Sequence, residues 1–323
     1  MTITPGKKRE KIDRLAELAA VRDDERGVSL WQEAFRRLRS NPAAIVGAAI
    51  FVLFVLVAVV GPFFVPYGPT DSIGIRDGVV KSGQGIIPGP SGDHWLGYDH
   101  QGRDVFSRMI VGARQTLLVG VVSTLIGLAV GALIGGIAGA SAGLGGRWGR
   151  WVDSTLMRFV DMLLALPSLL LAVSVAALLG ASLTTVMIAV GVVSVPVFAR
   201  LLRGSMISQS NSDYVLAATS LGVKRSRIAL THVVPNSLAP VIVQATLTLA
   251  TAIIEAAALS FLGLGNPDST IPEWGVMLAD AQPYLGIRPA LAIYPAVAII
   301  ITALGFTLLG EAMREALDPK LRK

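Results

Sequence analysis

Long apolar runs limit what this chain can fold into more than any other feature of its sequence. Hydrophobic residues make up 53% of the 323 residues and charged residues only 15%, whereas soluble domains carry about 25% charged residues. Too little charge is available to cover a water-facing surface. A helix that spans a bilayer needs about 20 mostly apolar residues, and the sequence contains several runs of that length. We therefore expect an all-α, polytopic membrane protein.

Six runs are long enough to be transmembrane helices. Five are clear, and the sixth, about Leu183–Leu202, contains Pro196 but has no charge before Arg200. The five clear runs are about Ala43–Val65, Leu117–Ala140, Phe159–Leu179, Ser237–Leu264 and Leu291–Gly310. Asn41 followed by Pro42 is typical of a helix start, so we expect the first span to begin there.

The basic residues indicate how the chain is oriented in the membrane. Of the 28 Lys and Arg residues, 22 lie in the two tails and in the alternate loops 147–158 and 200–227. Cytoplasmic segments carry the excess of positive charge, so both termini are expected in the cytoplasm of a cell-membrane protein. Because these residues flank apolar runs, the net charge of +6 is not interpreted as nucleic-acid binding.

The segments between the runs suggest a division of the chain. Ser29–Ser40 has apolar residues at helical spacing and basic residues off that stripe, which is typical of a helix in the membrane interface. The expected parts are a cytoplasmic tail with this helix (1–41), a first span (42–65), an extracytoplasmic loop subdomain (66–113), a five-helix core (114–310) that includes a loop at 211–235, and a cytoplasmic tail (311–323).

The loop at 211–235 contains the clearest functional pattern. Tyr214, Ala217, Ala218 and Leu221 recur at helical spacing and would share one face, and Gly222 would end that helix. A second helical stretch from Lys224 to Val234 follows, carrying Arg225, Arg227 and His232. The small apolar face predicts a helix that docks into a groove on a partner. The alternative is a loop helix that packs on the membrane surface.

Glycines recur at every fourth position in the second apolar run. They are Gly127, Gly131, Gly135, Gly139 and Gly143. One helix face without side chains allows another backbone to approach closely, so we expect helix packing here. The sequence leaves open whether the neighbouring helix belongs to this chain or to a partner subunit.

Two acids lie inside apolar runs. Asp161 is three residues from Arg158 and is expected to pair with it on one helix face. Glu255 has no basic residue nearby in sequence, and an intramembrane acid commonly marks a functional site. Glu255 is therefore a candidate for the translocation path, where it would bind the amino terminus of a peptide. The alternative is a hydrogen bond that holds its helix against a neighbour.

The outer loop contains two histidines and two aspartates within eleven residues. His94, Asp99, His100 and Asp104 are of the right chemistry to bind a divalent metal, but the stretch is also rich in the glycines and aromatics of structural turns. We expect no metal here and no catalytic group in the chain. The absence of cysteine excludes disulfides and thiol chemistry.

Several motifs together resemble one transporter family. YVLAATSLGVKRSRIALTHVVPN resembles the coupling loop of ABC importer membrane subunits, with Ala217, Ala218 and Gly222 at the family's positions and Leu216 where glutamate is usual. HWLGYDHQGRDVFSRMIVGARQTL, LSFLGLGNPD, PEWGVML and the C-terminal LGEAMREALDPKLRK are similar to the dipeptide/oligopeptide permeases, on the branch called the C subunit. The resemblance covers about Trp31 to Lys323.

The resemblance implies a type I importer permease that forms half of a pore. It further implies four kinds of partner: a homologous second permease subunit, two ATP-binding subunits or one fused ATPase, an extracytoplasmic peptide-binding protein, and the lipid bilayer. No phosphate-binding loop of the G-x-x-x-x-G-K-[ST] type occurs, so ATP and Mg are expected in the partner ATPase and no cofactor in this chain. The alternatives are a nickel, haem or other small-solute cargo, or an ATPase-independent, proton-coupled transporter that uses Glu255.

Overall fold

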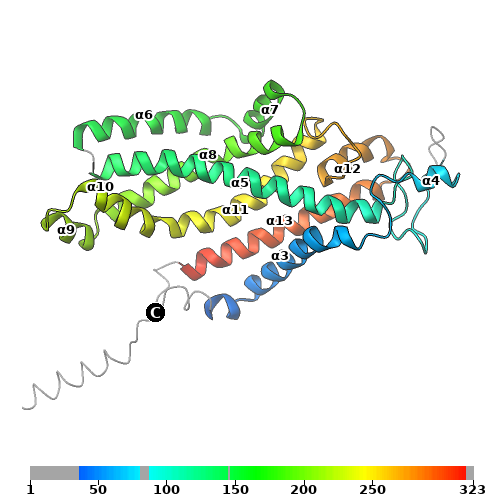
Figure 1. Cartoon of the computed structure of the whole chain (residues 1–323), viewed down its shortest axis with the longest axis horizontal. Helices are drawn as coiled ribbons and strands as arrows, with labels where there is room; N and C mark the ends of the chain where they lie inside the picture. Colours follow the sequence, from blue (N-terminus) through cyan, green and yellow to red (C-terminus); the bar gives the residue numbers. More distant parts are fainter. Residues whose placement is uncertain (1–35, 81–86, 145, 318–323) are drawn as a thin grey trace, which may run out of the picture.

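Five long helices lie side by side and set the shape of the molecule (Figure 1). The computed structural model describes residues 36–80, 87–144 and 146–317. The long helices are α3 (Pro42–Val60), α5 (Val105–Leu144), α8 (Leu183–Ser210), α11 (Val234–Phe261) and α13 (Ala290–Leu317). Each is long and apolar enough to cross a membrane. Asn41 starts the first as expected, because its side chain accepts hydrogen bonds from the amides of Ala43 and Ala44.

The expected third span is not one continuous helix. α6 (Gly146–Leu164) and α7 (Ser168–Leu179) are bent by 93° at a short break, and as one broken span they would be the sixth. Pro167 explains the break, because proline disfavours helical geometry in the residue before it. α6 also begins thirteen residues before the expected start at Phe159. The first turns of α6 are amphipathic, so they do not belong to the apolar run that predicted the span.

The second span also starts earlier than its apolar run. α5 begins at Val105 rather than Leu117, so residues 105–113 belong to this helix and not to the loop subdomain. The Asp104 carboxylate accepts a hydrogen bond from the Ser107 amide at 2.7 Å and so caps the helix. Arg108 and Arg114 lower the mean hydropathy of this first part of α5, so the apolar run in the sequence begins after them.

The smaller elements gather at the two ends of the bundle. α9 and α10 lie at one end, while α4 (Ile73–Arg76) and α12 (Trp274–Ala281) lie at the other (Figure 1). The outer segment has a small core of its own, formed by Ile73, Val80 and Tyr98. Of the expected interfacial helix at Ser29–Ser40, residues 36–40 are helical; its remainder, the rest of the 1–41 tail and residues 318–323 fall outside the described part of the chain.

The glycine-bearing face of α5 packs against α8 of the same chain. A Cβ atom added at Gly131 would lie 2.6 Å from the Phe198 Cβ and from the Val195 carbonyl oxygen, and one at Gly135 would overlap the backbone of Ala199. Gly127, Gly139 and Gly143 likewise face residues of α8. The predicted close packing is therefore confirmed, and the neighbouring helix is intramolecular.

Candidate functional site

Two short helices project at the end of the bundle where α8 leads into α11. α9 runs from Asp213 to Ser220, and α10 from Arg225 to Ile228, before a π-helical turn at Ala229–Val233. Gly222 lies between them at φ +75°, a conformation that residues with a Cβ atom rarely adopt. The predicted arrangement of helix, glycine corner and second helix is confirmed.

The outward face of α9 differs from the expected one because Leu216 belongs to it and Ala218 does not. Leu221 is 84% exposed and Leu216 is 59% exposed, and Ala217 lies on the same outer side. Ala218 instead packs inward with Val215, against a cluster that includes Phe198 of α8. The expectation that Ala218 faces outward is therefore wrong. The larger Val215 is the residue of α9 that the bundle buries, and Ala218, one turn later, follows it inward.

Tyr214 connects α9 to the last turn of α8. Its hydroxyl group donates a hydrogen bond to the Gln209 side-chain oxygen at 2.8 Å. Its ring also lies edge-on to that of His232, with the centroids 6.4 Å apart. Arg227 of α10 is exposed. A displacement of α9 would therefore act directly on the end of α8.

Two arginine–aspartate pairs join α6 to α8. Arg203 donates hydrogen bonds from Nε and Nη2 to the two carboxylate oxygens of Asp153, and only 11% of the Asp153 side chain is exposed. Arg200 binds Asp161 at 2.6 Å, and both side chains are 58% exposed. The predicted pairing of Asp161 with Arg158 is wrong. α6 lies along α8, so the acid meets a base of the neighbouring helix instead of one on its own.

Glu255 lies on α11 beside the bend between α6 and α7. It is half-buried, and Ser168, the first residue of α7, lies near its carboxyl group. No ion pair to Glu255 occurs within the described residues. A partly accessible carboxyl group inside an apolar helix has acceptor capacity for a donor from another molecule.

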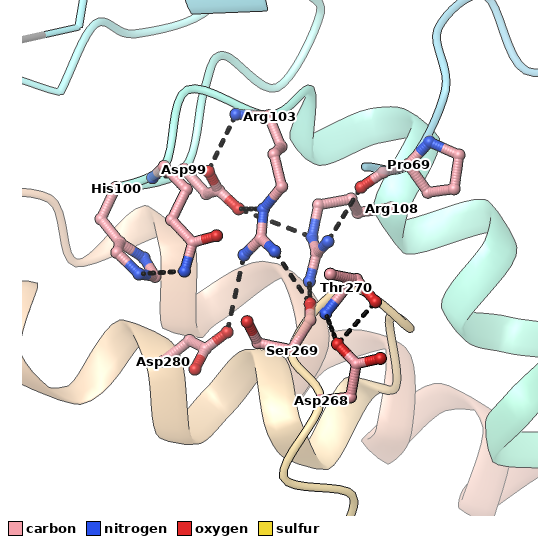
Figure 2. A network of polar contacts seen from close by, with 10 residues as sticks. Pro69, Asp99, His100, Arg103, Arg108, Asp268, Ser269, Thr270 and Asp280 are labelled. Atoms are coloured by element: carbon pink, nitrogen blue, oxygen red, sulfur yellow. Dashed lines mark hydrogen bonds and ion pairs between the residues drawn. The ribbon is translucent and has the colours of Figure 1, made fainter. Parts of the chain in front are cut away.

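Two buried arginines hold together the end of the molecule that carries α12 (Figure 2). Arg103 and Arg108 are 2% and 1% exposed. Arg103 donates to Asp99 at 2.6 Å, and both guanidinium groups donate to the Ser269 carbonyl oxygen at 2.8 and 2.9 Å. Asp280 of α12 lies 3.7 Å from Arg103. Sequence reasoning missed this network because Ser269 is 166 residues from Arg103.

The four residues considered as metal ligands, His94, Asp99, His100 and Asp104, do not form one cluster. His94 Nδ1 lies 2.8 Å from the buried Asp104 carboxylate. Asp99 belongs to the arginine network, and the His100 ring stacks on Tyr284 with the centroids 5.0 Å apart. Among residues 36–80, 87–144 and 146–317, no group of three His, Cys, Asp or Glu residues is placed to hold a metal ion. These side chains organise the loop.

Glu273 is a buried acid that no pattern in the sequence singled out. It is 2% exposed, and its two carboxyl oxygens lie 3.1 and 2.9 Å from the Ser260 hydroxyl oxygen at the end of α11. Burial raises the pKa of Glu273 to about 7, although the Ser260 hydrogen bond opposes the shift. Next to it, the Trp274 indole donates to the Met109 carbonyl at 2.9 Å. This contact attaches α12 to α5.

Comparison with known proteins shows the class of molecule to which this bundle belongs. Residues 131–323 match the family described as binding-protein-dependent transport system inner membrane component, and residues 29–77 match the N-terminal TM domain of oligopeptide transport permease C. The chain belongs to this permease family. It is a multi-pass membrane protein with the expected type I ABC importer permease fold. As a transport permease subunit it is not itself an enzyme.

The relatives of this permease agree with that assignment. A dipeptide transport system permease protein, DppC, from Alkalihalophilus pseudofirmus is 41% identical, with 93% of each chain covered. A glutathione transport system permease protein, GsiD, from Shigella flexneri is 41% identical over 90% of this chain and 91% of its own. A solved structure of the MetNI methionine ABC transporter in inward-facing conformations matches with a TM-score of 0.52 at 19% identity, covering 65% of this chain and 96% of the other. This structural match supports the fold.

Proposed function

We propose that this permease is the transmembrane subunit of an ATP-driven importer of di- and oligopeptides, in which it forms half of the translocation pore. The observation that carries the proposal is the outward apolar face of α9, formed by Leu216, Ala217 and Leu221 beside the Gly222 corner. No described part of the chain covers this face. A short helix that exposes apolar side chains and ends at a glycine turn is suited to docking into another protein.

In this proposal α9 is the coupling helix, and Arg227 and Tyr214 lie beside the contact. The ATP and Mg are bound by the docked ATPase, either two subunits or one fused chain, because the sequence has no phosphate-binding loop. A homologous permease completes the pore, and an extracytoplasmic binding protein delivers the solute. The distribution of basic residues supports cytoplasmic positions for both termini and for α9.

Peptide is the proposed cargo because of the relatives' names. The two with about 41% identity are named for dipeptide and for glutathione transport. Glu255 is proposed to face the path and to bind the ammonium group of the peptide, since its carboxyl group is half-buried and has no ion pair among the described residues. Nickel, haem or another small solute is the alternative cargo, and an ATPase-independent, proton-coupled transporter is the alternative mechanism.

The coupling role is tested by changing Leu221. Leu221→Asp places an unpaired charge in the docked contact, which costs about 3 kcal/mol or more, whereas Leu221→Met preserves its volume and apolar character. We expect both variants at wild-type levels in the membrane, because Leu221 is 84% exposed in this chain. Only Leu221→Asp should lose the co-purifying ATP-binding subunit and ATP-driven uptake. Retention of both by Leu221→Asp would show that α9 is not the coupling element.

A further inference from the structure

A hollow of about 640 Å³ opens on the bundle surface between α8 and α11, near the end of α6. Small-molecule sites in proteins measure about 300–1,000 Å³. Apolar side chains and prolines form part of the lining. The polar part consists of Arg200, Ser205, Ser208, Gln209 and Gln244. The hollow therefore has the size and the mixed lining of a site for a small polar solute.

The polar lining of the hollow does not suit a lipid tail as its occupant. Arg200 lies ten residues before Ser210, where the helix ends, which corresponds to about 15 Å at 1.5 Å per residue. Its side chain is 58% exposed. A charged side chain in or beside a span faces protein or water rather than lipid tails. This face of the bundle is therefore expected to meet water, a solute or another subunit.

The hydrogen-bonding capacity of Arg200 is mostly unused. A guanidinium group has five N–H donors, and within the described residues Arg200 donates one hydrogen bond, to Asp161. Arg203, one turn away, is held by both carboxylate oxygens of Asp153, which is largely buried. The Arg203 pair fastens two helices together. The Arg200 pair lies at the rim of the hollow with donors available.

We infer that this hollow is a binding site for the carboxylate group of a solute passing through the permease, and that the Arg200 guanidinium group binds it. The inference rests on the proposed import function and names the chemistry that recognises the cargo. Guanidinium groups match carboxylates geometrically and bind them through two parallel hydrogen bonds. Asp161 keeps Arg200 in position while the unused donors receive the solute. Ser205 and Gln244 provide uncharged hydrogen-bonding groups beside it.

The hollow also adjoins the coupling helix. Gln209, one of its lining residues, accepts the hydrogen bond from the Tyr214 hydroxyl group of α9. A bound solute would therefore contact the last turn of α8, which the docked ATPase would move through α9. Solute binding in the hollow and ATPase docking on α9 would both act on the last turn of α8.

The inference is tested first by measuring binding with a single cysteine at Ser205. The native chain has no cysteine, so a polar thiol reagent would report on this position alone. In the purified complex without ATP, alanylalanine should slow modification of Ser205→Cys at least tenfold. Its C-terminal amide, which lacks the carboxylate group, should not. Equal protection by both compounds, or by neither, would overturn the inference.

A double substitution identifies the residue that binds the carboxylate. Arg200→Gln combined with Asp161→Asn removes both charges without leaving either one unpaired, and protection by alanylalanine should disappear. Arg203→Gln combined with Asp153→Asn is the matched change in the neighbouring pair, and wherever that complex still assembles the protection should persist. Protection that survives the first pair of changes would show that Arg200 is not the binding group.

A plug in the hollow separates a solute site from a subunit contact. A Cβ atom at Gly204, which lines the hollow, or at Gly286 beyond α12 would meet nothing within 4 Å. Gly204→Leu should leave the partner permease bound and reduce ATP-driven uptake at least tenfold, whereas Gly286→Leu should keep uptake. Normal uptake by Gly204→Leu, or loss of the partner permease from its complex, would contradict the inference. The cysteine measurement needs no ATP, so it decides the inference even if wild-type uptake fails, a result that would count against the proposed function.

Discussion

Single buried ionisable groups determine the chemistry of the end of this permease that carries α12. Arg103 and Arg108 are almost inaccessible, yet the Asp99 carboxylate and the carbonyl groups of Ser269 and Pro69 accept hydrogen bonds from them. Glu273 is equally buried but has only the Ser260 hydroxyl group beside its carboxyl group. A buried acid without a basic partner keeps its proton up to a higher pH. Glu273 is therefore a residue through which pH affects this end of the fold.

The stability of the permease should fall between about pH 4.5 and pH 7 because of Glu273. Its carboxyl group has a pKa of 4.5 when free and about 7 in the fold. Between these values the unfolded chain is ionised while the folded chain holds its proton, so rising pH favours unfolding. The whole effect is about 3 kcal/mol. Glu273→Gln should remove it, so that the variant's melting temperature rises relative to wild type from pH 5 to pH 8. An unchanged difference at the two pH values would contradict this account.

At the scale of elements, the contact between α5 and α8 depends on the absence of side chains. Gly131 faces the Phe198 Cβ and the Val195 carbonyl oxygen, whereas Gly136 of the same helix faces only the end of the Leu202 side chain. The first position has no space for a methyl group, and the second has ordinary van der Waals space. Two glycines five residues apart should therefore respond oppositely to the same substitution.

Replacing Gly131 by alanine should destabilise the permease, and replacing Gly136 should not. A Cβ atom at 131 would lie 2.6 Å from Phe198 Cβ, whereas one at 136 would lie 3.8 Å from Leu202. Overpacking costs about 1–3 kcal/mol, while alanine in a helix interior is favoured over glycine by up to about 1 kcal/mol. Thermal unfolding of the purified variants measures the two signs. Equal melting temperatures for the two variants would contradict the prediction and show that α5 and α8 move apart to accept a methyl group at position 131.

Elements with local causes could be predicted from the sequence, and those with distant causes could not. The four-residue glycine repeat and the Gly222 corner are local patterns, and both predict the observed structure. The inward side of Ala218 depends on where Phe198 and its neighbours lie, which the period of a helix does not specify. Similarly, the pairing of Asp161 with Arg200 requires α6 to lie along α8, an arrangement that follows from the whole fold.

The whole molecule has its two specialised ends joined by α8 and α11. α9 lies at one end and α12 at the other (Figure 1). Tyr214 attaches α9 to the end of α8, and Glu273 attaches the start of α12 to the end of α11. A helix transmits displacement along its axis because its backbone hydrogen bonds are internal. Movement imposed on α9 would therefore reach the end that carries α12 through packed helices.

Reconstitution into vesicles tests the central claim, that this permease works as a subunit of an ATP-driven importer. The wild-type chain would be assembled with the homologous permease, the ATP-binding subunits and the extracytoplasmic binding protein. The account predicts peptide uptake only when ATP is supplied on the side of α9 and the binding protein on the opposite side. The chain alone, under a proton gradient, should transport nothing. Peptide uptake by the chain alone under that gradient, without nucleotide, would contradict the account.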